Sequence, residues 1–178
     1  MSGFMDDFST YLGACNIFRR VNCTGNKENC IVGAIVDYSK SSSSTGSMIG
    51  NGAFGPAGYV IGGLLGEERD RRVSNIYDYV FALLNFTELG VGIIPLSGGG
   101  MKINPEKQSP DYGGFVFFHY QELSEITAKN YLGIRKSVKA ITIRLSNGYK
   151  LHFNANMVEN TLPYQENAMK IIVSKYGK

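Results

Sequence analysis

A 21-residue run without a charged side chain, from Gly46 to Gly66, constrains this chain more than any other feature of its sequence. It reads GSMIGNGAFGPAGYVIGGLLG and contains eight glycines. A glycine costs about 1 kcal/mol in an exposed helix, so a helical run of this kind needs close packing or lipid to persist. Three interpretations compete: a phosphate-binding loop, a flexible linker, and a closely packed helical segment.

The phosphate-binding interpretation has a matching motif but lacks the flanking elements that the motif requires. Gly50 to Gly55 matches G-x-G-x-x-G, which binds a dinucleotide only between a strand and a helix, with an acid about 20 residues further on. Four consecutive serines at 41–44 precede the motif and predict a flexible joint. The nearest acids, Glu67 and Glu68, lie in a charged cluster. We therefore expect no nucleotide and no other cofactor.

The four-residue spacing of the glycines favours helix packing. A Gly-x-x-x-Gly repeat places small residues on one side of a helix, where another backbone can approach closely. Gly55-Pro56 divides the run into two short helices, which predicts a helical hairpin. The run resembles the glycine-zipper segments of bacterial proteins, which associate with membranes or join helices. That resemblance implies helix-packing or membrane-contact roles for Gly46, Gly50, Gly58, Gly62 and Gly66.

Several environments are open to this hairpin. A single membrane-spanning helix needs about 20 apolar residues, and Pro56 divides this run into two pieces that are too short. The hairpin could lie on or partly in a membrane, or pack against the protein.

The segment before the glycine run predicts a helix and one ambiguous element. Apolar residues from Phe4 to Phe18 follow a helical period, and Arg19-Arg20 suit the end of that helix. Cys30 to Val36 is an apolar run that fits a short strand or a buried helical turn. The spacing of the three cysteines is not that of a zinc site, so we expect no metal and expect Cys15 to be a small buried side chain.

Strand patterns dominate from Ile76 onward. The expected strands are 79–86, 89–95, 115–120, 122–126 and a shorter one at 131–134. Around Ser146-Asn147-Gly148, a three-residue loop with Gly148 in the left-handed conformation puts six apolar side chains on one face. It pairs Leu145 with Tyr149, Ile143 with Leu151, and Ile141 with Phe153. A final helix is expected to begin at Asn160 or Thr161, with Pro163 in its first turn.

This order of elements resembles the bacterial pleckstrin-homology-like (PH-like) domains. The residues that carry the resemblance are 86–91 (FTELGV) and 118–126 (FHYQELSEI), followed by the hairpin 141–153 and the final helix. The resemblance covers residues 76–178. It implies an α+β chain with a helical, glycine-rich region at 1–72 and a PH-like domain at 73–178. That domain would be an antiparallel barrel or sandwich of six or seven strands, closed by the C-terminal helix.

PH-like domains bind lipids, peptides or copies of themselves, so the resemblance implies a non-catalytic binding module. Thr87 and Glu88 occupy the first hairpin loop, which does not support phosphoinositide binding. His119 and His152 have no recognisable nucleophile spacing, which agrees with a chain that is not an enzyme. A basic group is a candidate ligand-facing set, or alternatively a charged strand edge that prevents aggregation: Lys129, Arg135, Lys136 and Lys139.

The net charge and the N-terminal residues limit the classes of partner and the location that we expect. A net charge of +3 is too small to imply nucleic acid. Met1-Ser2-Gly3 does not begin a secretory signal, so we expect a cytoplasmic location, with the inner face of a membrane as an option. The first hypothesis is an interaction module with a protein partner or self-association through the glycine segment. The alternative is a peripheral membrane protein whose glycine hairpin contacts lipid.

Overall fold

The structure, a computed structural model, describes residues 6–38, 71–73 and 75–177. The predicted glycine hairpin at 46–66 therefore lies outside the described residues. The described residues form two α-helices, α1 (Tyr11–Arg20) and α2 (Gln165–Tyr176). The strands are β1 (Asn29–Val36), β2 (Phe81–Phe86), β3 (Gly90–Gly98), β4 (Gln108–Pro110), β5 (Val116–His119), β6 (Leu123–Tyr131), β7 (Arg135–Leu145) and β8 (Lys150–Asn156). Short 3₁₀ helices cover Arg71–Val73, Ile76–Asp78, Tyr112–Gly114 and Tyr120–Glu122.

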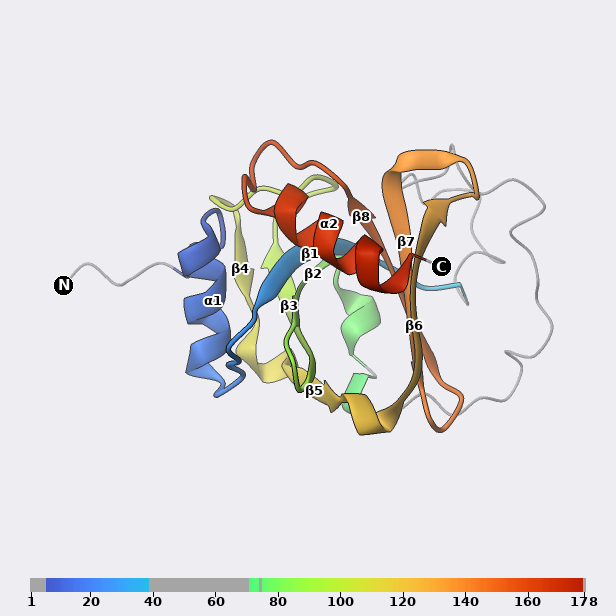
Figure 1. Cartoon of the computed structure of the whole chain (residues 1–178). Helices are drawn as coiled ribbons and strands as arrows, with labels where there is room; N and C mark the ends of the chain where they lie inside the picture. Colours follow the sequence, from blue (N-terminus) through green and yellow to red (C-terminus); the bar gives the residue numbers. More distant parts are fainter. Residues whose placement is uncertain (1–5, 39–70, 74, 178) are drawn as a thin grey trace.

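The described strands form one antiparallel sheet in the order β4-β3-β2-β1-β8-β7-β6, with β5 also paired to β3 (Figure 1). This confirms an α+β chain with a C-terminal helix, but the sheet has eight strands. Of the expected barrel or sandwich, the closed barrel is wrong, because the sheet is open. β6 pairs with β7 and not with β5, and α2 contacts both β1 and β6, so a helix rather than strand closure covers the apolar face.

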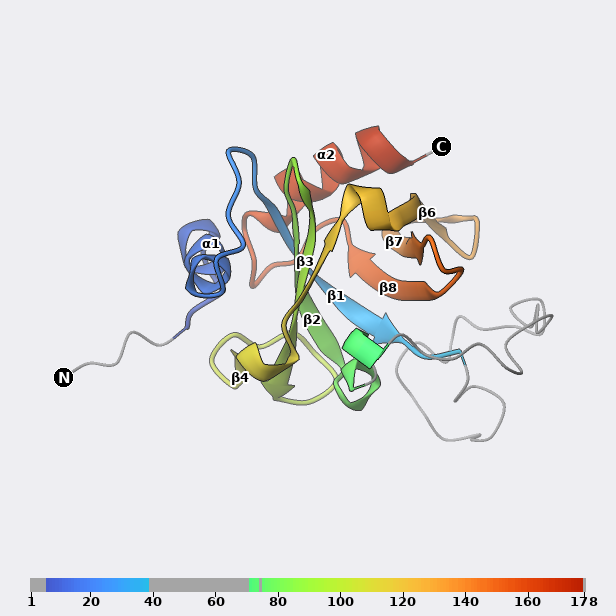
Figure 2. The ribbon, with the colours of Figure 1, turned by 90° about the horizontal axis from the view of Figure 1, so that it is seen from below.

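The ambiguous apolar run is strand β1, which lies inside the sheet between β2 and β8 (Figure 2). Cys30 and Val32 are buried on one face and Ile31 on the other. A strand buried on both faces reads as a continuous apolar run, which hides its two-residue period. The sheet of the C-terminal part thus includes a strand from the segment before residue 72.

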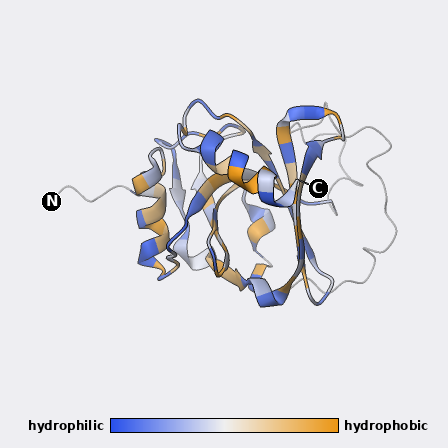
Figure 3. Cartoon of the chain, viewed as in Figure 1, coloured by the Kyte–Doolittle hydropathy of each residue, from blue (hydrophilic) through white to orange (hydrophobic). Residues whose placement is uncertain are grey.

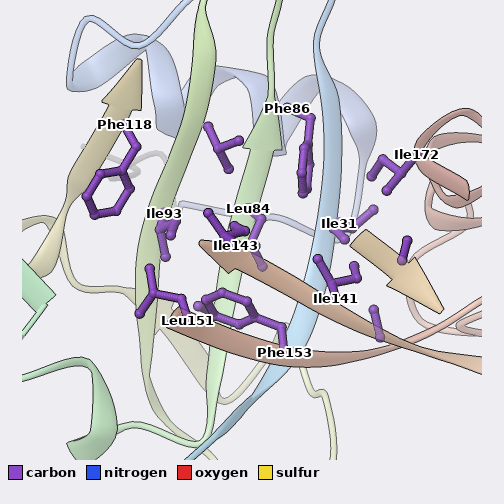
Figure 4. Close-up of a cluster of buried hydrophobic side chains, with 14 of the residues drawn as sticks. Ile31, Leu84, Phe86, Ile93, Phe118, Ile141, Ile143, Leu151, Phe153 and Ile172 are labelled. Atoms are coloured by element: carbon purple, nitrogen blue, oxygen red, sulfur yellow. The ribbon is translucent and has the colours of Figure 1, made fainter. Parts of the chain in front are cut away.

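Two groups of buried side chains lie on the two faces of β1, β2 and β3. One group fills the space between the two halves of the curved sheet and α2, and includes Ile31, Leu84, Ile93, Ile143 and Phe153 (Figure 4). The other lies under α1 and contains all three cysteines. Both helices thus pack on the same central strands, one on each face of the sheet.

Both helices begin later than predicted. Thr10 caps α1, because its hydroxyl accepts a hydrogen bond of 3.0 Å from the Gly13 amide, so residues 6–10 are not helical. The first turn of α2 follows Tyr164 instead of Asn160 or Thr161. Gln165 explains this start: it is fully buried and its side chain bonds the backbone of Val32 and Asn156.

The hairpin formed by β7 and β8 is as predicted. Ile141 pairs with Phe153 and Ile143 with Leu151. The amide of Leu145 donates to the carbonyl of Tyr149 at 2.8 Å, and Gly148 has a φ of +92°. The short strand predicted at 131–134 is wrong, since β6 ends at Tyr131 and the next three residues form a turn into β7.

Candidate functional site

The predicted basic group lies on the hairpin formed by β6 and β7, at the opposite end of the molecule from α1 (Figure 1). Lys129, Arg135 and Lys136 are exposed near the turn between the two strands. Lys139 differs, because it is only 9% exposed and its ammonium group donates to the side-chain oxygen of Asn130 on the facing strand. The structure therefore leaves three of the four cations exposed near this turn and uses the fourth inside the hairpin.

The turn itself has an unusual backbone. Leu132 and Gly133 have φ values of +54° and +75°, and the amide of Ile134 donates to the carbonyl of Tyr131 at 3.3 Å. A left-handed conformation costs roughly 1–2 kcal/mol for a residue with a side chain, and tight hairpin turns prefer Asn-Gly. Among the described residues, Asn22 is the other non-glycine residue with a positive φ, and asparagine tolerates it.

Apolar side chains project from the same turn. Leu132 is 47% exposed, and Ile134, at 81%, is the most exposed large hydrophobic side chain in the described part of the chain. The turn region carries both hydrophobic and hydrophilic residues (Figure 3). Two aliphatic groups on one turn, flanked by cations, form an exposed surface that is both apolar and basic.

Charge is segregated along the sequence around this turn. Between Ile126 and Val158 the chain has six lysines and arginines and no aspartate or glutamate, although its net charge is only +3. Glu125, just before this stretch, lies 4.0 Å from Arg144, away from the turn. Near the turn, neither strand therefore carries an acid that offsets the cations, and the rest of the chain has a net negative charge.

The cysteines have structural positions. Cys15 is buried as predicted, and Cys23 and Cys30 are buried as well. A hydrogen bond with Cys30 lowers the pKa of Cys15, whereas that bond and burial raise the pKa of Cys30. Burial raises the pKa of Cys23 to about 11. Among the described residues no three cysteine, histidine or acidic side chains are grouped in a way that could hold a metal ion.

The two histidines are also engaged. The ring of His119 packs edge-on against Phe117, with centroids 4.8 Å apart. Nδ1 of His152 lies 3.0 Å from the hydroxyl of Thr142, and its ring packs against Tyr38. Burial, together with the charge of Lys150, lowers the pKa of His152 to about 4, so this ring is neutral at physiological pH.

Two surface hollows have polar groups that the fold already uses. A cavity of about 180 Å³ lies beside Arg72 and Tyr79. The guanidinium of Arg72 lies 2.7 Å from the carboxylate of Glu122, and the hydroxyl of Tyr79 donates a hydrogen bond to Asp111. A second hollow, of about 350 Å³, lies beside Pro163. Three of its polar lining groups cap α1 or bond to backbone carbonyls: Thr10, Tyr11 and Tyr164.

Comparison with known proteins gave no match to a family model, a curated protein or a solved structure. The resemblance to PH-like domains and to glycine zippers therefore stays a prediction. In the part of the chain that the structure describes, no helix has the length and apolar character needed to cross a bilayer. The five glycines predicted to pack or to contact a membrane lie outside that part.

The sequence identifies the cations of this site but not its apolar members. Its pattern predicts a strand for Leu132 and Ile134, because leucine and isoleucine favour buried or half-buried positions. The signal that could have found them is the 33-residue stretch without an acid, since this turn lies within it. Gly133, between two aliphatic residues, also indicates a turn.

Proposed function

We propose that this chain is a non-catalytic binding module whose contact surface is the β6–β7 tip, defined as Lys129, Leu132, Ile134, Arg135 and Lys136. The observation that carries the proposal is the exposed Leu132 in a left-handed backbone, next to the still more exposed Ile134. A residue that strains its turn and exposes apolar surface without stabilising the fold points to a role in contact with a partner.

The non-catalytic part of the proposal rests on how the reactive side chains are used. The three cysteines lie in the apolar group under α1, and His152 is a buried, neutral ring bonded to Thr142. These positions are typical of structural residues rather than of a nucleophile with its base. The proposed role of the glycine run in self-association or lipid contact stays a separate prediction, because it lies outside the described residues.

A photo-crosslinking amino acid at position 134, in cells that express the full chain, tests the contact surface. The matched control carries the same group at Val158, which is also exposed but lies between β8 and α2. We expect a discrete protein or lipid adduct from position 134 and none from position 158. Equal adducts from both positions, or none from 134, would show that the β6–β7 tip is not a contact surface.

A further inference from the structure

We infer that the partner of the β6–β7 tip is the surface of an anionic lipid bilayer, into which Leu132 and Ile134 insert. This inference rests on the proposed function and names its partner. It differs from the predicted membrane contact of the glycine run, since it uses other residues in another part of the chain.

The shape and chemistry of the tip favour a bilayer over a protein pocket. The apolar residues lie on a projecting turn at the end of a two-stranded hairpin (Figure 1). Protein interfaces concentrate their binding energy in tryptophan, tyrosine and arginine within well-packed pockets. The turn exposes two aliphatic side chains and buries its one aromatic neighbour, Tyr131, which suits the soft boundary between headgroups and acyl chains.

The spacing of the cations matches the layers of a bilayer. Arg135 and Lys136 follow Ile134 directly, so the backbone of Lys136 lies within about 7 Å of that of Ile134. An inserted apolar group lies about 5–10 Å deep, at the boundary between headgroups and acyl chains. When Ile134 is at that boundary, Arg135 and Lys136 are therefore level with the headgroup phosphates. Lys129, two residues before Tyr131 on β6, adds a third exposed cation on the facing strand.

The charge around the tip matches an anionic surface. The 33 residues that include both sides of the turn have no acid, so an anionic lipid meets attraction from both strands. Lys139 is excluded from direct contact by its bond to Asn130, which instead joins the two strands beside the turn. The negative remainder of the chain would orient the protein with the tip toward the membrane.

Sedimentation of the full chain with lipid vesicles tests the inference. Vesicles of neutral phosphatidylcholine are compared with vesicles that also contain about 30% phosphatidylserine, near the charge of a cytoplasmic leaflet. We expect binding to the anionic vesicles, weakened by added salt. The variant R135Q/K136Q should bind about 25-fold less tightly, at about fivefold per cation. The variant L132N/I134T should lose on the order of 30-fold.

Matched controls separate the tip from general effects. K102Q/K107Q removes the same charge from the loop before β4, and L89S/V158T removes two exposed apolar side chains elsewhere. Both controls should bind like the unmodified chain. Anionic vesicles that fail to bind the chain would overturn the inference, as would binding that the tip variants leave unchanged. A protein adduct from position 134 together with no vesicle binding would overturn the bilayer but leave the proposed function standing.

Discussion

The buried side chain of Gln165 completes the hydrogen bonding of the central strand, and its replacement by leucine is the sharpest test of the fold. Gln165 Oε1 accepts from the amide of Val32 at 2.8 Å, and Nε2 donates to the carbonyls of Val32 and Asn156 at 3.3 and 2.9 Å. β8 pairs with β1 only from Ala34 onward. The first turn of α2 therefore takes the place of a strand partner at Val32.

The expected size of the effect follows from the backbone groups that leucine would leave without a hydrogen-bond partner. Gln165→Leu has nearly the same volume but leaves the amide and the carbonyl of the fully buried Val32, and the carbonyl of the more exposed Asn156, without these bonds. Each unsatisfied buried group costs about 1–3 kcal/mol. The two groups of Val32 alone therefore cost about 2–6 kcal/mol, a large part of the roughly 5–15 kcal/mol that stabilises a typical domain.

Denaturant unfolding measures this loss, and amide hydrogen exchange locates it. The control is Gln121→Leu, the same chemical change at an exposed position, which should alter the free energy of unfolding by less than about 0.5 kcal/mol. Exchange at the Val32 amide should accelerate more than at the other amides of β1. If Gln165→Leu unfolds at the same denaturant concentration as Gln121→Leu, the side chain does not complete the strand.

Three further predictions concern single residues. Leu132→Asn should raise the free energy of unfolding by about 0.5–1 kcal/mol, because asparagine tolerates the left-handed conformation; an unchanged or lower melting temperature would contradict this. His152 has a folded pKa of about 4 against an ordinary 6.5, so the unfolded chain binds the proton first. Stability should therefore fall by on the order of 3 kcal/mol as pH drops through this window, and His152→Gln should flatten that dependence in unfolding curves at several pH values. Gly92→Ala would place a methyl group 2.7 Å from the Cys23 sulfur and should cost about 1–3 kcal/mol; calorimetry would measure it, and Cys23→Ala in the same chain should recover part of the loss.

Local patterns predict the parts of this fold that depend on neighbouring residues. The hairpin formed by β7 and β8 is one, because only one loop length puts Leu145, Ile143 and Ile141 on the same face as their partners. The position of β1 could not be predicted in this way. Its apolar run is buried on both faces, so nothing in the pattern says which strands flank it.

Features set by distant contacts are predicted less well. Pro163 and Thr161 suggest an earlier start for α2, but the bonds of Gln165 to β1 and β8 determine where the helix lies. The open sheet depends on whether β6 meets β5, which no local signal reports. At the candidate site, the positive φ of Leu132 arises from closure of the turn with Gly133, not from the preference of leucine.

A single tryptophan at position 134 tests the central claim most directly, namely that the β6–β7 tip enters a lipid bilayer. The chain has no tryptophan, so Ile134→Trp reports on that position alone, and Val158→Trp is the matched control. With anionic vesicles, we expect the indole emission of the Ile134→Trp variant to shift to shorter wavelength and to be quenched by brominated acyl chains. The emission of the Val158→Trp variant should not change. Vesicle-bound protein whose position-134 emission stays that of a water-exposed indole would contradict the account.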